Sequence, residues 1–221
     1  MKLKVNRLGL KYGKDVIFNN LSFELNEGEI LAFKGLNGSG KSSLCSCLTG
    51  LFEEDFAKDN IRGEILYDNI NLNNMSIAEK CNAFGLIFQN PDDQLFSPLV
   101  IEELAFAPEN LNVPREEIQR RIDLALKTCK IEHLKNAKIN TLSGGEKQLV
   151  AIASILTMQP QILIADEITS RIDKEKIDDI RQILIDFARS GKSVIMISHN
   201  ENDLKIASRV IVLERGKNYA N

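Results

Sequence analysis

Apolar residues along the chain follow two patterns, which predict strands in two different environments. Polar and apolar residues largely alternate over 2–8 and alternate strictly over 21–25, as expected for strands with one buried face. Elsewhere three or four apolar residues follow one another without alternation, which is typical of strands buried on both faces of a parallel sheet. These uninterrupted runs begin at Ile30, Leu86, Ile162, Val194 and Val210.

Apolar residues three or four positions apart, together with helix-starting residues, predict helices between these strands. Ser76 opens a capping box with Glu79, and Ser143 can cap another helix. A further helix should begin after Pro114, and an amphipathic helix should cover 177–187. Because buried strands alternate with helices, the fold class is α/β, with a largely parallel sheet covered on both faces.

Glycine and proline mark the expected ends of several helices. Gly85 should end the helix that follows the first capping box, and Pro108 should end a helix over 99–107. The helices between 91 and 134 are expected to form a subdomain set into the α/β body. The stretch 53–60 is interpreted as an acidic surface insertion.

Composition narrows the class of protein. The chain has 221 residues, 43% of them hydrophobic and 27% charged, which predicts one folded domain, with or without a small subdomain. A net charge of −3 gives no reason to expect nucleic acid as a partner. No apolar run approaches the ~18 residues of a membrane span, and no signal peptide is recognisable, so a cytoplasmic location is expected. The cysteines show no C-x-x-C pairing and are expected to be reduced and mostly buried: Cys45, Cys47, Cys81 and Cys129.

The stretch from Gly35 to Ser43 has the spacing G-x-x-x-x-G-K-S between a predicted strand and a predicted helix. Its glycines allow the backbone to curl around phosphate groups at the N-terminus of the helix. Lys41 would reach the β- and γ-phosphates, Ser42 would ligate Mg²⁺, and Ser43 would contact the α-phosphate. The alternative interpretation is a glycine-rich turn with a surface lysine.

Polar residues also follow the buried strands at their carboxyl ends, where open α/β sheets bind ligands. Asp166 is suited to hold Mg²⁺, and Glu167 to orient or deprotonate an attacking water. His199 could contact the γ-phosphate, and Gln89 could sense metal and water. Each residue alone could equally be a solvated loop, a cap or a packing residue.

Two more features extend the nucleotide hypothesis. Tyr12 could stack on a base, although a tyrosine beside Gly13 is commonly a turn residue. Ser143, Gly144 and Gly145 at a helix N-terminus could form a second anion site. One triphosphate does not need two such sites from one chain. A dimer in which each chain offers its second site to the other chain's nucleotide would use both.

The order of these motifs resembles the nucleotide-binding domain of the ABC ATPases. The resemblance implies ATP and Mg²⁺ as cofactors, and a dimer with a second ATPase subunit, either itself or a paralogue. Leu142 to Gln148 matches the family signature, and Ser170 to Asp173 the loop that contacts the partner subunit. The residues implied to bind ATP are Tyr12, Gly35, Asn37, Gly38, Ser39, Gly40, Lys41, Ser42 and Ser43, with Ser143, Gly144 and Gly145 acting on the partner's nucleotide. The implied catalytic residues are Glu167, His199, Lys41 and Gln89, and the implied metal site is Ser42, Gln89 and Asp166.

The same resemblance implies the P-loop NTPase fold of the ABC ATPases. Its core would be a mixed or parallel sheet with an N-terminal antiparallel β part and an inserted α-helical subdomain. The RecA-like body would cover about 1–90 and 140–221, and the helical subdomain about 91–139.

A narrower resemblance lies in 89–96 and 102–118, which are similar to the ATPases of energy-coupling-factor importers of cobalt, nickel and vitamins. It implies a place on the cytoplasmic face of the membrane, with a transmembrane scaffold and a substrate-binding membrane subunit as partners. The acids near this stretch could form a negative groove for a basic coupling helix: Asp92, Asp93, Glu102 and Glu103.

Two alternatives to a transport ATPase stay open, and departures from the family pattern bear on the second of them. Glu146 replaces the usual Gln, Leu149 stands where Arg is common, Ile168 replaces Pro, and Arg171 replaces a small residue. The first alternative is a soluble ABC-type ATPase that is not coupled to transport. The second is a partner subunit that binds ATP but hydrolyses it poorly.

Overall fold

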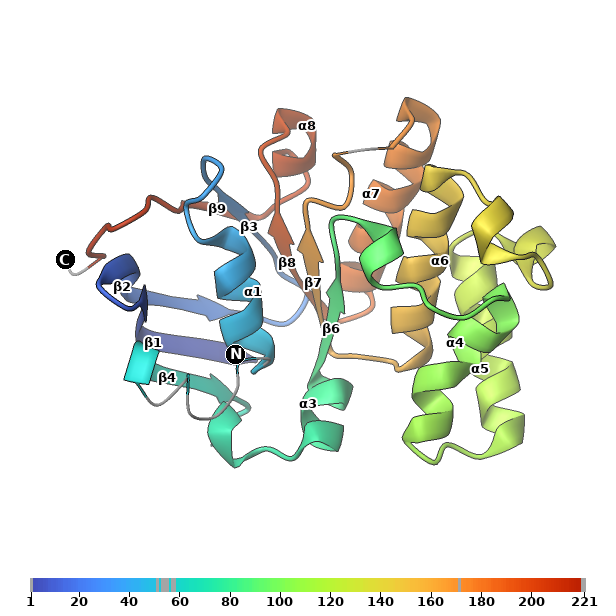
Figure 1. Ribbon diagram of the computed structural model, residues 1–221, viewed down its shortest axis with the longest axis horizontal. Coiled ribbons are helices and arrows are strands. Elements are labelled where there is room, and N and C mark those ends of the chain that lie inside the picture. The colour runs from blue at the N-terminus through green and yellow to red at the C-terminus, as the bar shows by residue number, and fades with distance from the viewer. Residues whose placement is uncertain (1, 51, 53–55, 57–58, 171, 220–221) are drawn as a thin grey trace.

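The fold consists of two sheets and a set of helices arranged side by side (Figure 1). The computed structural model describes residues 2–50, 52, 56, 59–170 and 172–219. Most of the stretch expected to be an acidic insertion, 53–60, therefore lies outside the described residues, as does Arg171.

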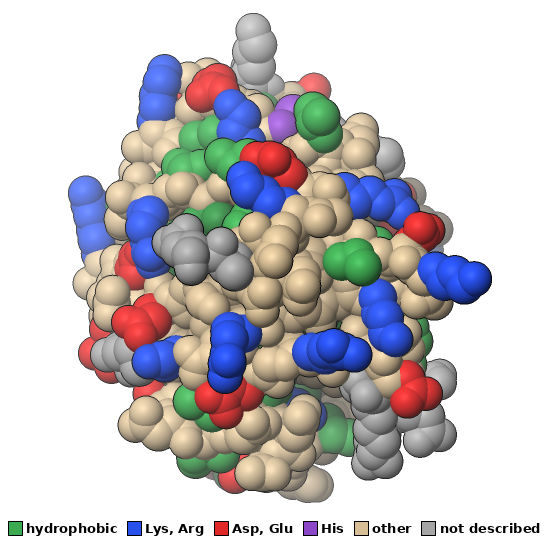
Figure 2. Space-filling model, turned by 90° about the vertical axis from the view of Figure 1, so that its left-hand side faces the viewer, with side chains coloured by type: hydrophobic (Ala, Val, Ile, Leu, Met, Phe, Trp, Pro, Cys, Tyr) green, Lys and Arg blue, Asp and Glu red, His purple; other side chains and the backbone are tan. Residues whose placement is uncertain are grey.

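The N-terminal part of the chain forms an antiparallel sheet with the strand order β2-β1-β4-β5. Its strands are β1 (Leu3–Tyr12), β2 (Asp15–Leu25), β4 (Ile61–Tyr67) and β5 (Ile70–Asn71). β1 and β2 are longer than their alternation predicts, because they continue as a hairpin to the Tyr12–Asp15 pair, with Gly13 in the left-handed region. On the face shown in Figure 2, Lys and Arg side chains are spread among acidic ones.

The second sheet is entirely parallel, with the order β6-β7-β8-β3-β9. Its strands are β3 (Ile30–Lys34), β6 (Phe84–Ile87), β7 (Ile162–Asp166), β8 (Ser193–Ile197) and β9 (Arg209–Val212). The expectation that the last strand is buried was wrong. β9 lies at the edge of the sheet, where Val210 is 41% and Val212 is 49% exposed.

Helices cover both faces of the parallel sheet, as expected. The helices are α1 (Lys41–Thr49), α3 (Ile77–Ala83), α4 (Val100–Asn110), α5 (Arg115–Thr128), α6 (Gly144–Thr157), α7 (Lys174–Arg189) and α8 (Glu201–Leu204). Short 3₁₀ turns are η1 (Leu72–Asn74), η2 (Pro91–Asp93), η3 (Glu132–Leu134) and η4 (Ile139–Thr141). Within the described part of the chain, no helix combines the length and the apolar character needed to cross a bilayer.

The uninterrupted apolar runs are explained by two hydrophobic cores on opposite faces of the parallel sheet. Leu31, Ile164 and Ile195 point into a core shared with α1 and the antiparallel sheet. Their neighbours Ala32 and Leu163 point into a second core shared with α4, α5, α6 and α7. Both faces of each central strand are therefore buried, so alternation disappears from the sequence. The helices within 91–139 belong to the second core, and the boundaries of a separate helical subdomain stay a prediction.

Two expected helix ends were wrong. Gly85 lies in β6 and not at a helix end, because α3 already ends at Ala83, with Phe84 as its C-cap. A Cβ at Gly85 would lie 2.3 Å from Cγ2 of Ile155, so the glycine allows α6 to approach the sheet closely. Pro108 lies inside the last turn of α4, which continues to Asn110.

Candidate nucleotide-binding site

A cavity of about 700 Å³ opens where β3, β7 and β8 end, at the upper edge of the sheet in Figure 1. It brings together residues that the sequence predicted from four separate stretches. Predicted residues that line it are Asn37, Gly38, Gly40, Lys41, Ser42, Ser43, Gln89, Asp166, Glu167 and His199. Ile17, Ser170 and Arg215 line it as well.

The glycine-rich loop joins β3 to α1 and wraps around the side chain of its own lysine. The Lys41 ammonium donates to the carbonyls of Gly35 (2.8 Å) and Leu36 (3.1 Å). Gly40 has φ 97°, and a Cβ there would lie 2.3 Å from Ile17 Cγ2, so only glycine is tolerated at this position. The loop is therefore shaped by backbone constraints before any ligand binds.

Ser39 supplies a direct indication of a ligand in this loop. Its side chain is buried, and its hydroxyl is a buried polar atom with no hydrogen-bond partner among the described residues. Buried hydroxyls are rarely left unpaired, so an orphan of this kind calls for an explanation. A phosphate oxygen in the cradle would supply the missing partner.

Asp166, at the end of β7, reaches the first turn of α1. Its Oδ2 accepts a hydrogen bond from the Ser42 hydroxyl at 2.7 Å. Burial raises the pKa of Asp166, and the nearby Glu167 charge adds to this, while the Ser42 hydrogen bond and Lys41 oppose it. A hydroxyl and a carboxylate side by side are hard oxygen donors of the kind that Mg²⁺ prefers.

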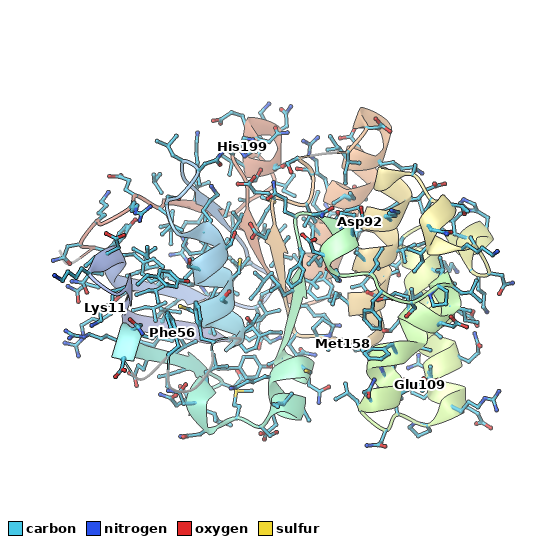
Figure 3. All side chains as sticks on the ribbon, viewed as in Figure 1. Lys11, Phe56, Asp92, Glu109, Met158 and His199 are labelled. Carbon is cyan, nitrogen blue, oxygen red and sulfur yellow. The ribbon has the colours of Figure 1, made fainter. Side chains whose placement is uncertain are left out.

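Glu167 is the point where the predicted catalytic residues meet. It is 8% exposed and has a positive φ of 49°. Its Oε1 lies 3.2 Å from Lys41 Nζ, while its Oε2 lies 3.4 Å from His199 Nδ1 and 3.4 Å from Gln89 Nε2. His199 itself is largely exposed, at the upper edge of the molecule in Figure 3. The Glu167 carboxylate therefore contacts the three other residues that were predicted to be catalytic, Lys41, His199 and Gln89.

Tyr12 lies beside this cavity without lining it. Its hydroxyl donates to Ser43 Oγ at 3.4 Å, at the outer range of a hydrogen bond. Its ring centroid is 5.3 Å from that of Phe56 and 6.4 Å from that of Phe52. The structure thus places an aromatic group next to α1, and stacking on adenine stays a prediction.

The predicted second anion site lies elsewhere, because none of Ser143, Gly144 and Gly145 lines the cavity. Ser143 caps α6 in a full capping box: its hydroxyl accepts from the Glu146 N–H, and Glu146 Oε2 accepts from the Ser143 N–H at 2.8 Å. These bonds from Ser143 lower the pKa of Glu146. A Cβ added at Gly144 would meet nothing within 4 Å, so this helix N-terminus is open.

Polar contacts connect the segment after Gln89 to α6. Gln94 accepts from the Phe88 N–H at 3.0 Å and donates to the Ala151 carbonyl at 3.2 Å. Gln148 donates to the Phe88 carbonyl at 3.2 Å. Asp92, labelled in Figure 3, pairs with Lys147 at 2.6 Å. We call these four contacts the η2–α6 clamp.

The four acids after Gln89 do not share one surface, contrary to expectation. Glu103 is 5% exposed and accepts from the backbone N–H groups of Phe96 (3.1 Å) and Ser97 (2.8 Å). Asp92 is exposed but forms an ion pair with Lys147. Glu103 therefore orders the chain before α4 and cannot contribute to an exposed negative groove.

Some residues at the site were not predicted. Ile17 comes from β2 and Arg215 from the loop after β9, where it also lies 3.6 Å from Asp15. No local signal in the sequence marks either one. Ser170 accepts a hydrogen bond from Gln89 Nε2 at 3.3 Å, so the predicted partner-contact loop also borders this cavity.

The substitutions that depart from the family pattern are accommodated within the chain. Ile168 and Leu149 are buried in the core shared with the helices. Glu146 completes the capping box of α6. None of these three disturbs the fold, and Arg171 lies outside the described residues.

A glycine-rich loop between a buried strand and a helix, with acids at the end of a neighbouring parallel strand, defines a P-loop nucleotide-binding protein. A family model described as ABC transporter matches residues 18–170. The chain therefore belongs to the ABC transporter family, as an ATP-binding subunit that hydrolyses ATP. The fold class implied by the motifs is confirmed.

Relatives support the assignment in sequence and in structure. The energy-coupling factor transporter ATP-binding protein EcfA1 of Fusobacterium nucleatum is 38% identical over 215 residues, covering 97% of this chain and 80% of that protein. The structure of cbiO1 from Clostridium perfringens, part of the ABC transporter complex cbiONQ, has a TM-score of 0.85 and 33% identity, covering 97% of this chain and 85% of that one. The ATP-binding cassette MJ0796, in a dimeric post-hydrolysis state bound to ADP and Pi, has a TM-score of 0.82 and 27% identity, covering 96% and 94%.

Proposed function

We propose that this chain hydrolyses ATP as one half of a nucleotide-sandwich dimer and powers a membrane importer of a micronutrient, either a metal ion or a vitamin. The observation that carries the catalytic part is the meeting of Lys41, His199 and Gln89 at the Glu167 carboxylate. Most of the residues that would act on one nucleotide line one cavity; the exceptions are Tyr12 beside it and Gly35 and Ser39 within the glycine-rich loop.

The glycine-rich loop binds the triphosphate in this proposal. Lys41 leaves the carbonyls of Gly35 and Leu36 and contacts the β- and γ-phosphates. The orphan hydroxyl of Ser39 and the N–H groups at the start of α1 donate to phosphate oxygens. The donor set of Ser42, Asp166 and Gln89 suits Mg²⁺, which when bound supplies charge that neutralises the phosphates.

Glu167 orients the attacking water and accepts its proton, as a buried carboxylate at the edge of the cavity can do. His199, within 3.4 Å of the same carboxylate, contacts the γ-phosphate and holds the water-binding geometry. The capped N-terminus of α6 acts on the nucleotide of the partner chain, because Ser143 and Gly144 lie outside this chain's own cavity.

A second groove supports the coupling to a membrane scaffold and a substrate-binding membrane subunit at the cytoplasmic face. It has a volume of about 550 Å³ between α4 and α5, and its charged lining residues are three acids, Glu102, Glu109 and Glu116, and one base, Arg115. The exposed rings of Phe96 and Phe106 pack edge to face beside α4, with centroids 4.5 Å apart. An acidic groove with nearby exposed aromatics suits an amphipathic basic helix. The names of the relatives EcfA1 and cbiO1 favour an energy-coupling-factor importer.

The catalytic part is tested with Glu167→Gln. We expect this variant to keep ATP binding, to slow hydrolysis by ~10²-fold or more, and to accumulate as an ATP-bound dimer. Size-exclusion chromatography with ATP and a phosphate-release assay measure both effects. Near-normal turnover would remove Glu167 from the catalytic role.

The sandwich is tested with Ser143→Arg, which places bulk and charge where the partner's nucleotide would lie. We expect loss of ATP-driven dimerisation and of hydrolysis, with ATP still bound by the chain's own loop. Ser76→Arg is the matched control, because Ser76 opens the same kind of capping box on α3. A monomer that hydrolyses ATP as fast per site as the dimer contradicts the proposal.

A further inference from the structure

Asp203, on α8, has a buried carboxylate that does not line the cavity described above. Its side chain is 1% exposed, and three segments of the chain converge on its carboxylate. The Thr169 hydroxyl donates to Oδ2 at 2.5 Å, and the Ser198 hydroxyl donates to the same oxygen at 2.8 Å. Arg181 of α7 donates to Oδ1 through Nε at 2.8 Å and also pairs with it through its terminal nitrogen at 2.7 Å.

Two of these contacts come from the segments that carry the proposed catalytic side chains. Thr169 lies two residues after Glu167, and Ser198 directly precedes His199. Glu167 and His199 come from different strands, β7 and β8. Asp203 therefore joins the two segments beyond the ends of these strands, in addition to the direct contact between Glu167 and His199.

The loop that holds His199 is closed by the same group. The Ser198 hydroxyl accepts from the Asn200 N–H at 3.0 Å while donating to Asp203. The Asp203 N–H donates to the Asn200 carbonyl at 3.0 Å. His199 thus projects from a turn whose two flanking residues are both fixed, although its own ring is exposed.

The turn that holds Glu167 needs a comparable restraint. A positive φ is unfavourable for a residue with a side chain, so surrounding contacts must maintain it. The Glu167 N–H donates to the Ile197 carbonyl at 2.9 Å, and the Ser170 N–H donates to the Glu167 carbonyl at 3.0 Å. Thr169 lies between these two contacts, and its hydroxyl donates to Asp203.

A buried, paired carboxylate is not an efficient source of folding stability by itself. Burying an ion pair costs desolvation that packed apolar groups of similar volume avoid. Bonds to a charged acceptor are, however, stronger and better defined in geometry than bonds between neutral groups. The arrangement therefore favours a role in fixing positions.

We propose that Asp203 is a positioning residue for ATP hydrolysis, whose carboxylate holds the Glu167 and His199 segments in the relative placement that brings both side chains to one point beside Lys41. This inference rests on the catalytic roles proposed above for Glu167 and His199. Asp203 itself does not line the cavity in which the nucleotide is proposed to bind.

The test removes, one at a time, the two hydroxyl groups that connect the Glu167 and His199 segments to Asp203. Each variant has a matched control. Thr169→Val and Ser198→Ala delete one hydroxyl that donates to Asp203. Thr157→Val and Ser193→Ala delete equally buried hydroxyls that donate to backbone carbonyls, of Ser154 at 2.6 Å and of Asn26 at 2.8 Å. Ser193 lies at the opposite end of β8, and Met158, the neighbour of Thr157, lies far from His199 in Figure 3.

For the full-length chain with ATP and Mg²⁺, we expect Thr169→Val and Ser198→Ala to lower kcat by roughly 10-fold or more, with the KM for ATP changed by no more than about 2-fold. The controls should lower the unfolding midpoint by a similar amount without lowering kcat. Thr169→Ser keeps the hydroxyl and should restore the rate. Since both hydroxyls act through one carboxylate, Asp203→Asn should lower kcat at least as much, and adding Thr169→Val to it should have little further effect.

Equal kcat in the test and control variants would overturn the inference and leave Asp203 with a structural role only. Glu167→Gln is measured in the same series to separate this result from a failure of the proposed function. If Glu167→Gln abolishes turnover while Thr169→Val and Ser198→Ala do not reduce it, the positioning role alone is wrong. If Glu167→Gln leaves turnover intact, the assignment of the catalytic residues is wrong.

Discussion

At the residue scale, the candidate site holds groups whose environment works against folding stability. Burial raises the pKa of Asp166, so its ionised form is less favourable in the folded chain than in the unfolded one. Glu167 has a positive φ, and Ser39 buries a hydroxyl without a partner among the described residues. Unfavourable features gathered at one place are typical of functional sites, where a ligand supplies the missing interactions.

Asp166→Asn is therefore expected to stabilise the nucleotide-free chain at neutral pH. A folded-state pKa above the ordinary value of 3.8 means that stability is lost as Asp166 ionises with rising pH. The gain from the variant should be present above the raised pKa and should vanish as the pH falls towards 3.8. Denaturant unfolding at several pH values measures it.

Asp123→Asn is the control of opposite sign. The hydrogen bond from Lys135 lowers the pKa of Asp123, so its ionised form is favoured in the folded chain. That variant should be neutral or destabilising at neutral pH. A loss of stability in Asp166→Asn at neutral pH would contradict the argument from burial.

The cysteines give a second prediction at this scale. Burial raises the pKa of Cys47 and of Cys129 to about 12, and raises that of Cys45 as well. Because the thiolate is the reactive form, these three should resist thiol reagents in the native chain, while the half-buried Cys81 reacts first. Labelling with a chromogenic disulfide should modify one thiol rapidly and all four only after unfolding. Rapid native labelling of Cys47 would contradict the burial seen here.

At the scale of elements, the sequence predicted the buried strands other than β9, the capping box at Ser76 and the cap at Ser143, because these depend on local pattern. It predicted Gly85 wrongly, because the role of this glycine depends on a contact with a distant residue, and it ended α4 before Pro108, although the helix continues to Asn110. Glycine is required at position 85 because Ile155, 70 residues further along the chain, packs closely against it. Glu103 looked like an exposed acid of a helix face, yet it accepts bonds from the chain that precedes α4.

Gly85→Ala tests this account of β6. A Cβ there would lie 2.3 Å from Ile155 Cγ2 and 2.9 Å from Pro160 Cγ, so α6 would have to shift. We expect a loss of about 1–3 kcal/mol in the free energy of unfolding. Gly144→Ala is the control, since a Cβ there meets nothing within 4 Å. Equal stability of the two variants would mean that the approach of α6 is not limiting.

At the scale of the whole molecule, the predicted residues that line the cavity follow strands of the parallel sheet. Their meeting follows from topology, since parallel strands end at a common edge. Ile17 and Arg215 could not be predicted, because they reach the cavity only through the packing of β2 and of the loop after β9 against the glycine-rich loop.

The groove between α4 and α5 gives a prediction at the same scale. Glu102→Lys combined with Glu116→Lys reverses two of its acids. We expect loss of co-purification with membrane subunits, while the ATPase rate of the chain alone stays within about 2-fold. Glu64→Lys on β4 is the control. Loss of both assembly and turnover would indicate a folding defect, and loss of neither would leave the groove without a partner.

The η2–α6 clamp has a consequence for steady-state kinetics. Gln89 contacts Glu167 beside one nucleotide, and the clamp connects the segment that follows Gln89 to α6. The first turn of α6 would contact the other nucleotide of the dimer. In the proposed dimer, occupancy of one site would therefore alter the affinity of the second. The hydrolysis rate should rise with ATP concentration with a Hill coefficient above one. Replacing Gln94 by Leu, which removes two of the four contacts, should bring that coefficient down towards one.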